Sequence, residues 1–156
     1  MSVFQDFPRI TPFLWFDSNA EEAVEFYLTV FQNSRRFDKL NNSHEKVGPV
    51  GKVLTISFEL DGQKFIALNG GPMFKFNESV SFMVRCDSQQ EVDEYWSKLT
   101  AGGQESQCGW LEDKFGLSWQ IVPTKLLDLI KNPKGMAAMM KMKKIDLAEV
   151  ERATRG

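Results

Sequence analysis

The order strand, helix, strand, strand, strand occurs twice in this 156-residue chain, and this repeat restricts the possible folds more than any other feature. In the first half, the apolar run Ile10–Phe16 predicts a buried strand, and apolar residues spaced three and four apart predict a helix over residues 20–30. Strands are expected at residues 34–40, 52–60 and 63–69, and the last two flank Asp61-Gly62, a dipeptide typical of a two-residue hairpin.

The second half repeats this order with a strand at 79–86, a helix at 89–100 and three short strands within 104–123. Its last turn contains Gly116, which aligns with Gly62 of the first hairpin. Three of the expected helices follow a potential capping residue with a glutamate three positions later, at Asn19 and Glu22, Ser88 and Glu91, and Asp146 and Glu149.

A repeat of this size indicates duplicated structural units, each too small to bury a full core alone. The predicted fold is therefore α+β, a single domain over residues 1–156 built from two tandem βαβββ modules. Module one is expected at about 8–74 and module two at about 78–123, with C-terminal helices at about 124–154.

The composition excludes several classes of partner. With 19 basic and 21 acidic residues, the formal net charge is −2, so no nucleic acid or anionic membrane partner is expected. No apolar run approaches the ~20 residues that span a bilayer, and the N-terminus lacks the pattern of a signal peptide. Two cysteines make no disulfide framework, so a reducing cytoplasm is the expected compartment.

Several short motifs in a fixed order resemble one known family: LNGGP, VRCD, QQEVDEYW, CGWLEDKFG and SWQIVP. They resemble the PhnB-like group, often labelled 3-demethylubiquinone-9 3-methyltransferase-like, of the vicinal oxygen chelate superfamily. That superfamily also contains glyoxalase I, bleomycin-resistance proteins and extradiol dioxygenases. The resemblance covers about residues 10–153 and implies a curved mixed sheet around a cavity, usually in a homodimer.

The resemblance also implies where a divalent metal would be held, because superfamily enzymes place one ligand near each of four strands. The repeat puts these positions at or near Pro12, Ile66, Ser81 and Gln120. None carries a carboxylate, imidazole or thiolate, the groups that hold a hard or borderline ion. We therefore expect no metal, which argues against glyoxalase or dioxygenase chemistry.

Methyl transfer, which the family label suggests, predicts a glycine-rich turn between a parallel strand and a helix for S-adenosylmethionine. The turn after the first strand is Asp17-Ser18-Asn19, so no cofactor is expected. Cys108 would need a nearby cation or base to act as a nucleophile, and a small buried side chain beside a turn is the simpler interpretation.

The candidate ligand-binding residues come from strand alternation together with the implied cavity. Polar contacts are expected from Gln120, Ser81, Arg85 and Asn69, and apolar walls from Phe58, Met83 and Trp110, with Cys108 nearby. Arg85 would hold a carboxylate or phosphate, or else reach solvent at the strand end; Asn69 would line the mouth or shape a turn. Trp119 alternates with Gln120 and is expected beneath a helix.

The leading hypothesis is a cytoplasmic homodimeric protein, of binding or unassigned enzymatic activity, that takes a small, possibly aromatic or quinone-like molecule in a metal-free cavity. The alternatives are a metal-dependent lyase, isomerase or dioxygenase, and methyl transfer to a ubiquinone precursor. The methionine-rich tail, with Met136, Met139, Met140 and Met142, would contact a partner subunit, cover a pocket mouth or pack onto its own sheet.

Overall fold

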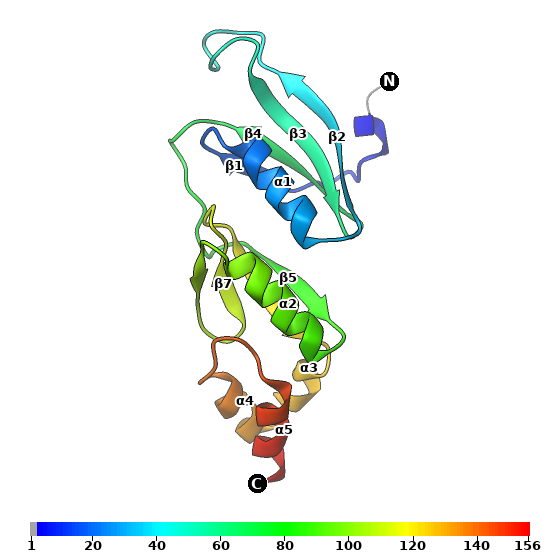
Figure 1. Cartoon of the computed structure of the whole chain (residues 1–156), viewed down its shortest axis with the longest axis vertical. Helices are drawn as coiled ribbons and strands as arrows, with labels where there is room; N and C mark the ends of the chain where they lie inside the picture. Colours follow the sequence, from blue (N-terminus) through cyan, green and yellow to red (C-terminus); the bar gives the residue numbers. More distant parts are fainter. Residues whose placement is uncertain (1–2) are drawn as a thin grey trace. The chain divides into compact units, whose positions relative to one another are not determined.

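The computed structural model of the chain describes residues 3–156, apart from the side chains of residues 3 and 4 (Figure 1). After a short 3₁₀ helix, Val3–Asp6, the chain forms two compact units, one ending at Lys75 and the other beginning at Phe76. Each unit contains one four-stranded mixed sheet and one long helix in the order βαβββ, and a helical tail follows the second. This is the tandem arrangement predicted from the repeat.

The first unit consists of five elements: β1 (Phe13–Phe16), α1 (Ala20–Val30), β2 (Ser34–Asn41), β3 (Val53–Leu60) and β4 (Gln63–Asn69). The strand order is β1-β4-β3-β2, with β1 parallel to β4 and the other pairs antiparallel. At the β3–β4 turn, Asp61 and Gly62 both have positive φ, 49° and 88°, as a type I′ hairpin requires.

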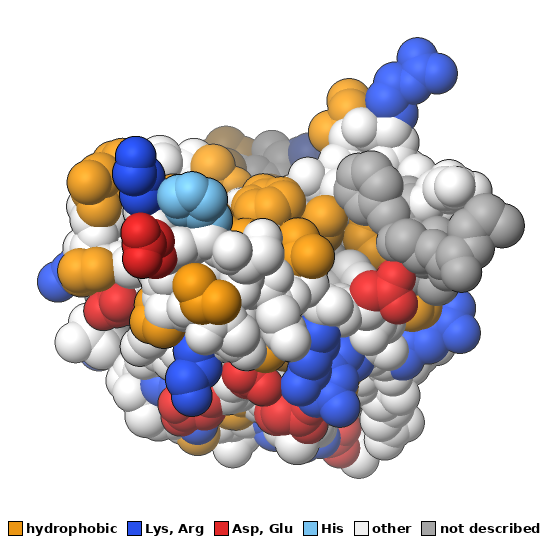
Figure 2. Space-filling model, turned by 90° about the horizontal axis from the view of Figure 1, so that it is seen from above, with side chains coloured by type: hydrophobic (Ala, Val, Ile, Leu, Met, Phe, Trp, Pro, Cys, Tyr) orange, Lys and Arg blue, Asp and Glu red, His pale blue; other side chains and the backbone are white. Residues whose placement is uncertain are grey.

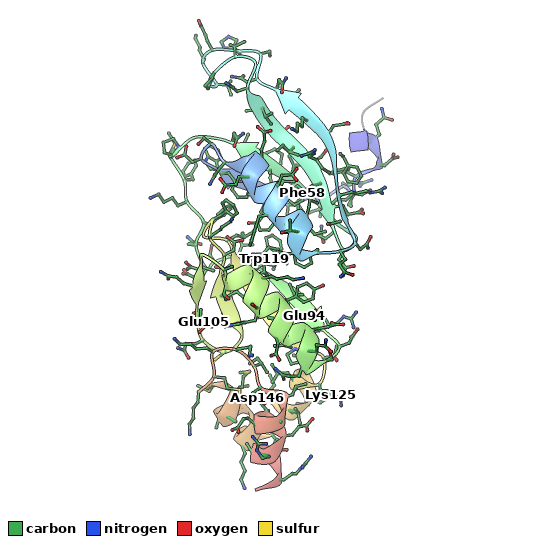
Figure 3. All side chains as sticks on the ribbon, in the orientation of Figure 1. Phe58, Glu94, Glu105, Trp119, Lys125 and Asp146 are labelled. Atoms are coloured by element: carbon green, nitrogen blue, oxygen red, sulfur yellow. The ribbon has the colours of Figure 1, made fainter. Side chains whose placement is uncertain are left out.

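The core of the first unit lies between α1 and one face of its sheet. Alternate strand residues on that face are buried against α1 side chains such as Ala23 and Tyr27: Leu14, Phe16, Ile56, Phe58, Leu60, Phe65 and Ala67. Phe58, on β3 (Figure 3), is fully buried. Its ring stacks on those of Tyr27 and Phe65, with centroids 6.4 and 5.3 Å away. Its prediction as a pocket wall was therefore wrong, because its strand parity matches Ile56 and Leu60.

The N-terminus of α1 is capped by a residue from elsewhere in the chain. Asn19 has a φ of −115° and ψ of 27° and makes no side-chain capping bond, so the capping box predicted there was wrong. Instead, Oδ1 of Asn69 accepts a 2.8 Å hydrogen bond from the backbone N–H of Ala20. Nδ2 of Asn69 donates to the carbonyl of Val53 at 2.9 Å. Asn69 thus joins the ends of β4, α1 and β3.

The second unit consists of β5 (Ser81–Cys86), α2 (Gln89–Thr100), β6 (Gln104–Glu105), β7 (Trp110–Glu112) and β8 (Ser118–Pro123). The strand order is β5-β8-β7-β6, and only β5 and β8 pair in parallel. Ser88 caps α2 by accepting from the N–H of Glu91 at 3.2 Å, as predicted. The Glu91 carboxylate accepts from the N–H of Asp87, one residue before the expected donor.

The turn between β7 and β8 is organised by a buried carboxylate. Asp113 is 3% exposed, and its Oδ1 accepts from the backbone N–H groups of Phe115 and Leu117 at 2.8 and 3.1 Å. Its Oδ2 accepts from Nε1 of Trp119 at 2.9 Å. Trp119 is 3% exposed, and α2 contacts its strand. The two carboxylate oxygens therefore fix both the turn and the indole beneath the helix.

The tail forms three short helices, α3 (Leu126–Leu129), α4 (Pro133–Met139) and α5 (Leu147–Arg155), that pack on the second unit. Leu126, Ile145 and Val150 form one buried cluster with Val122 of β8, and Met139 and Met142 pack against this cluster. Gln89 of α2 holds the tail through both amide atoms, donating to the carbonyl of Ile145 and accepting from the N–H of Leu147. Packing onto its own unit is thus the arrangement found.

Within the described residues, no helix is both long and apolar enough to cross a lipid bilayer.

Candidate functional site

The candidate site is the face of the second sheet that points away from α2. Strand register places Ser81, Ser118 and Glu112 side by side in one row across β5, β8 and β7. The next row consists of Met83, Gln120 and Trp110. Since side chains of paired residues share a face, these two rows form one surface with mixed polar and apolar character.

The central polar contact of this surface joins two of the predicted ligand-binding residues. Nε2 of Gln120 donates a 2.9 Å hydrogen bond to Oγ of Ser81. The bond orients the amide and leaves its carbonyl oxygen as an acceptor, because an amide has both kinds of group. Gln120 is partly exposed, whereas its neighbour Trp119 is buried. The expected parity of Trp119 and Gln120 is therefore observed.

Beside this pair lies a buried hydroxyl. Ser118 is 1% exposed, and among residues 3–156 its Oγ finds no hydrogen-bond partner. A buried hydroxyl without a partner costs ~1–3 kcal/mol, so such groups are uncommon in folded proteins. Ser118 was missed from the sequence, although alternation from Gln120 places it on the same face.

A pair of carboxyl groups borders the same row. Glu78 precedes β5, and Glu112 lies on β7. A side-chain hydrogen bond with Glu78, together with burial and the charges of Glu78 and Asp113, raises the pKa of Glu112. Hydrogen bonds with Glu112 and with its own backbone lower the pKa of Glu78. The two shifts are opposite in direction, so Glu112 is the carboxyl of the pair that keeps a proton more readily.

The other predicted residues of the second unit make no side-chain contact with the Gln120–Ser81 pair in the hydrogen bonds found. Met83 is 56% exposed on the edge strand β5, and Trp110 is partly buried beside Gln120. Arg85 is exposed at the strand end and forms a 2.9 Å ion pair with Asp87. Cys108 lies in the turn before β7 with a φ of 60°, and its N–H donates to the carbonyl of Met142. The ion pair partly neutralises Arg85 as an anion-binding group.

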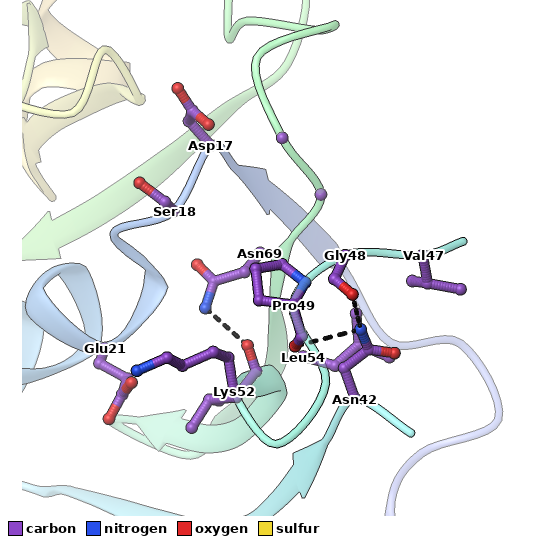
Figure 4. A pocket seen from close by; sticks show the side chains of 13 residues that line it. Asp17, Ser18, Glu21, Asn42, Val47, Gly48, Pro49, Lys52, Leu54 and Asn69 are labelled. Atoms are coloured by element: carbon purple, nitrogen blue, oxygen red, sulfur yellow. Dashed lines mark hydrogen bonds between the residues drawn. The ribbon is translucent and has the colours of Figure 1, made fainter. Parts of the chain in front are cut away.

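Asn69 lies in a different place, in the first unit. It lines a pocket of about 380 Å³ between the α1 N-terminus, the ends of β1 and β4, and the loop 42–52 (Figure 4). Glu21 and Lys52 also line this pocket, but both amide atoms of Asn69 are bonded to backbone. The exposed loop beside it carries the histidine and several apolar side chains, which gather on one surface (Figure 2). Asn69 therefore shapes the wall more than it offers a free ligand contact.

The metal-ligand positions implied by the sequence resemblance can now be located in each unit. Gln120 is in register with Met83, two residues after Ser81, and its counterpart Ile66 is in register with Phe13. The first-strand counterpart of Ser81 is thus Thr11, one residue before the predicted Pro12. Two hydroxyls, an amide and an aliphatic side chain do not fit a divalent metal. Among the residues described, no group of three His, Cys, Asp or Glu side chains is placed to hold an ion.

Comparisons with known proteins identify similar chains. The model of a family described as 3-demethylubiquinone-9 3-methyltransferase matches residues 8–122. The putative 3-demethylubiquinone-9 3-methyltransferase PhnB protein from Bacillus cereus is 31% identical with a TM-score of 0.68, and the match covers 75% of this chain and 100% of that one. Protein PA1353 from Pseudomonas aeruginosa is 19% identical with a TM-score of 0.60, over 74% of this chain and 97% of that one.

A more distant likeness concerns the fold alone. The fosfomycin resistance protein FosX from Mesorhizobium loti is 10% identical with a TM-score of 0.56, and the match covers 80% of this chain and 97% of that one. The search of curated proteins finds no match. The family match ends at Val122, so the tail helices α3, α4 and α5 lie beyond the matched region.

Proposed function

Since the chain belongs to the PhnB-like 3-demethylubiquinone-9 3-methyltransferase family of the vicinal oxygen chelate superfamily, we propose that it binds a small organic molecule on the open face of the second sheet, without a metal. The hydrogen bond between Gln120 and Ser81 carries this proposal. It occupies, with neutral groups, the positions where the superfamily pattern implies metal ligands. Such a pair recognises a polar organic group by hydrogen bonding.

The surroundings of this pair favour a ligand with an apolar or aromatic body. Trp110 and Met83 flank Gln120 in register, and Met83 is more than half exposed. An indole and a flexible thioether together suit a flat molecule, because both adapt to aromatic surfaces. Quinone-like compounds and aromatic acids are the first candidates. Whether binding leads to a reaction is a separate question, since the described residues of this face include no paired nucleophile and base.

A homodimer in a reducing compartment completes the proposal. Cys86 is buried and Cys108 partly exposed, and both are free thiols, which fits the cytoplasm. The family resemblance supports the dimer. Size-exclusion chromatography with light scattering tests the dimer, and a monomer at micromolar concentration would contradict it.

A ligand screen by tryptophan fluorescence, followed by calorimetry, tests the binding function. Quinones, aromatic acids and thiol conjugates are the compounds to screen, with Gln120→Met as the variant. We expect at least one compound to bind and Gln120→Met to weaken it about tenfold, since a bonded polar contact is lost. Gln90→Met on α2, outside this face, is the matched control. A hit that Gln120→Met leaves unchanged would contradict the site.

The family description itself favours methyl transfer to a ubiquinone precursor as the second candidate. Against it, β1 and α1 are joined by Asp17-Ser18-Asn19 rather than a glycine-rich turn, and the sheets are not doubly wound. Calorimetry with S-adenosylmethionine decides between the two. Micromolar binding of S-adenosylmethionine would favour methyl transfer. Metal analysis of protein purified without chelator tests the metal-dependent alternative, which a stoichiometric metal ion would support.

A further inference from the structure

The duplicated units place a carboxylate at the same register position but surround it differently. In the first unit, Glu59 lies in register between Arg35 and Lys64. In the second unit, the corresponding row places Glu112 between Gln104 and Ser118. Glu59 therefore has a cationic residue on each side, and Glu112 has a neutral residue on each side.

Both cationic side chains beside Glu59 in the first unit have interaction partners. Arg35 forms a 3.7 Å ion pair with Glu59. Nζ of Lys64 lies 5.3 and 5.9 Å from the ring centroids of Phe7 and Phe37 and donates to the carbonyl of Asp6. An ammonium group on this face of the first unit is thus held between aromatic rings and oxygen acceptors.

The second unit retains the acceptors and lacks the cation. Ser118 lies in register with Glu112, and its hydroxyl is buried without a partner. Interaction with a second carboxyl, that of Glu78, raises the pKa of Glu112. Among the described residues, no lysine or arginine forms an ion pair with Glu78 or Glu112. Two adjacent carboxyl groups cannot both ionise cheaply unless a proton or a cation lies between them.

We propose that Glu78, Glu112 and Ser118 form a subsite for the protonated amino group of a small organic amine. The inference rests on the proposed ligand-binding function and adds that the ligand carries a positive charge. An ammonium group has three N–H donors and no acceptor, and the two carboxyl groups and the hydroxyl supply three oxygen acceptors. A cation beside both carboxyl groups would favour their charged forms.

The neighbouring row sets the shape of the ligand. Trp110 and Met83 lie two residues along their strands from Glu112 and Ser81, a separation of about 7 Å at the usual strand rise. That distance is spanned by a two-carbon linker between an amino group and an aromatic ring. The indole of Trp110 would also attract the positive charge. An arylalkylamine therefore fits both rows.

An inorganic divalent ion fits these groups less well. Calcium takes six to eight oxygen ligands, and magnesium requires octahedral geometry with several retained waters. The two rows together offer two carboxyl groups, the hydroxyl of Ser118 and the amide oxygen of Gln120, and the described residues supply no third acidic or imidazole ligand. An ammonium group needs only the three acceptors that are present.

Three matched probes test the subsite by calorimetry at pH 7.5: 2-phenylethylamine, the neutral 2-phenylethanol and the anionic 3-phenylpropionate. We expect the amine to bind at least tenfold more tightly than the alcohol, and the acid to bind most weakly. Glu112→Gln should weaken the amine at least tenfold without affecting the alcohol, and Ser118→Ala should weaken it several-fold. Glu94→Gln removes the same charge from α2 and should change nothing (Figure 3).

The outcomes separate this inference from the binding function itself. Equal affinity for amine and alcohol, sensitive to Gln120→Met, would overturn the ammonium subsite while supporting the proposed function. Amine binding that survives Glu112→Gln would also overturn the subsite, as would tight binding of Mn²⁺ or Ca²⁺ that Glu112→Gln abolishes. Circular dichroism and a thermal unfolding curve for each variant confirm that a loss of binding is not a loss of fold.

Discussion

Replacing Asn69 with alanine should destabilise the protein by about 2 kcal/mol, although Asn69 is a partly exposed residue at a strand end. The substitution removes the side-chain cap of α1, which is worth ~1 kcal/mol at a helix N-terminus. It also removes the bond to the carbonyl of Val53, worth another ~1 kcal/mol. Val53 lines the pocket, where water partly replaces the lost bond to its carbonyl, whereas Ala20 is buried.

Urea unfolding, followed by both circular dichroism and tryptophan fluorescence, measures this loss. With a denaturant slope of ~2 kcal/mol per molar urea, the midpoint should fall by about 1 M. Asn69→Asp should have an intermediate effect, because its carboxylate keeps the acceptor for Ala20 and suits the helix dipole, but repels the carbonyl of Val53. Asn19→Ala is the control and should cost less than ~0.5 kcal/mol, since Asn19 makes no capping bond.

The comparison of Asn19 and Asn69 decides between two descriptions of the same helix end. If Asn19→Ala is as costly as Asn69→Ala, the cap is local and the long-range bond contributes nothing. If neither variant shifts the midpoint, the end of α1 is held by packing alone. Either result would refute the assignment of the cap to Asn69.

Three further predictions concern the second unit. Asp113→Ala should cost about 3 kcal/mol in urea unfolding, because three N–H donors lose the carboxylate that accepts from them, and an unchanged midpoint would contradict this. In the native protein one thiol, that of Cys108, should react with Ellman's reagent at pH 8, because burial raises the pKa of Cys86 to about 12; two fast-reacting thiols would contradict this. The hydrogen bond from Lys144 lowers the pKa of Asp93, so its stabilising effect is present above the ordinary carboxyl pKa and is lost as pH falls through the lowered value. Asp93→Asn should therefore lower the thermal midpoint at pH 7 and match the wild type at pH 2; a constant difference would contradict the linkage.

The elements and the helix-covered faces could be predicted because they depend on local spacing. The strands, both helices and the Asp61-Gly62 hairpin follow from periodicity and from one dipeptide, and Ser88 caps α2 as its sequence indicates. Burial beneath a helix demands apolar side chains at fixed intervals, so a covered face leaves a clear pattern. Phe58 shows the limit, since it was assigned to a wall although its own alternation with Ile56 and Leu60 places it in the core.

The cap of α1 could not be predicted from local sequence. Asn19 occupies the right position with Glu22 three residues later, yet the bond comes from Asn69, 49 positions after Ala20. A capping motif reports only which local bond is possible. When a strand end brings a second amide to the same N–H, the three-dimensional contact decides which side chain is used.

The open face of the second sheet was hard to predict because its chemistry depends on register rather than on periodicity. The first hairpin turns in two residues and pairs Leu60 with Gln63, whereas the second uses five and pairs Glu112 with Ser118. Aligning Gly62 with Gly116 shows that Ile66 and Gln120 are equivalent, but it does not show which residues lie opposite them on the neighbouring strands. Inserting or deleting one residue in the second turn would move Glu112 to the helix-covered face, because side chains alternate with a period of two. The carboxyl pair and the unpartnered hydroxyl exist as a site only because the five residues around Asp113 hold that register, so stability of the turn and recognition at the face should be lost together when Asp113 is replaced.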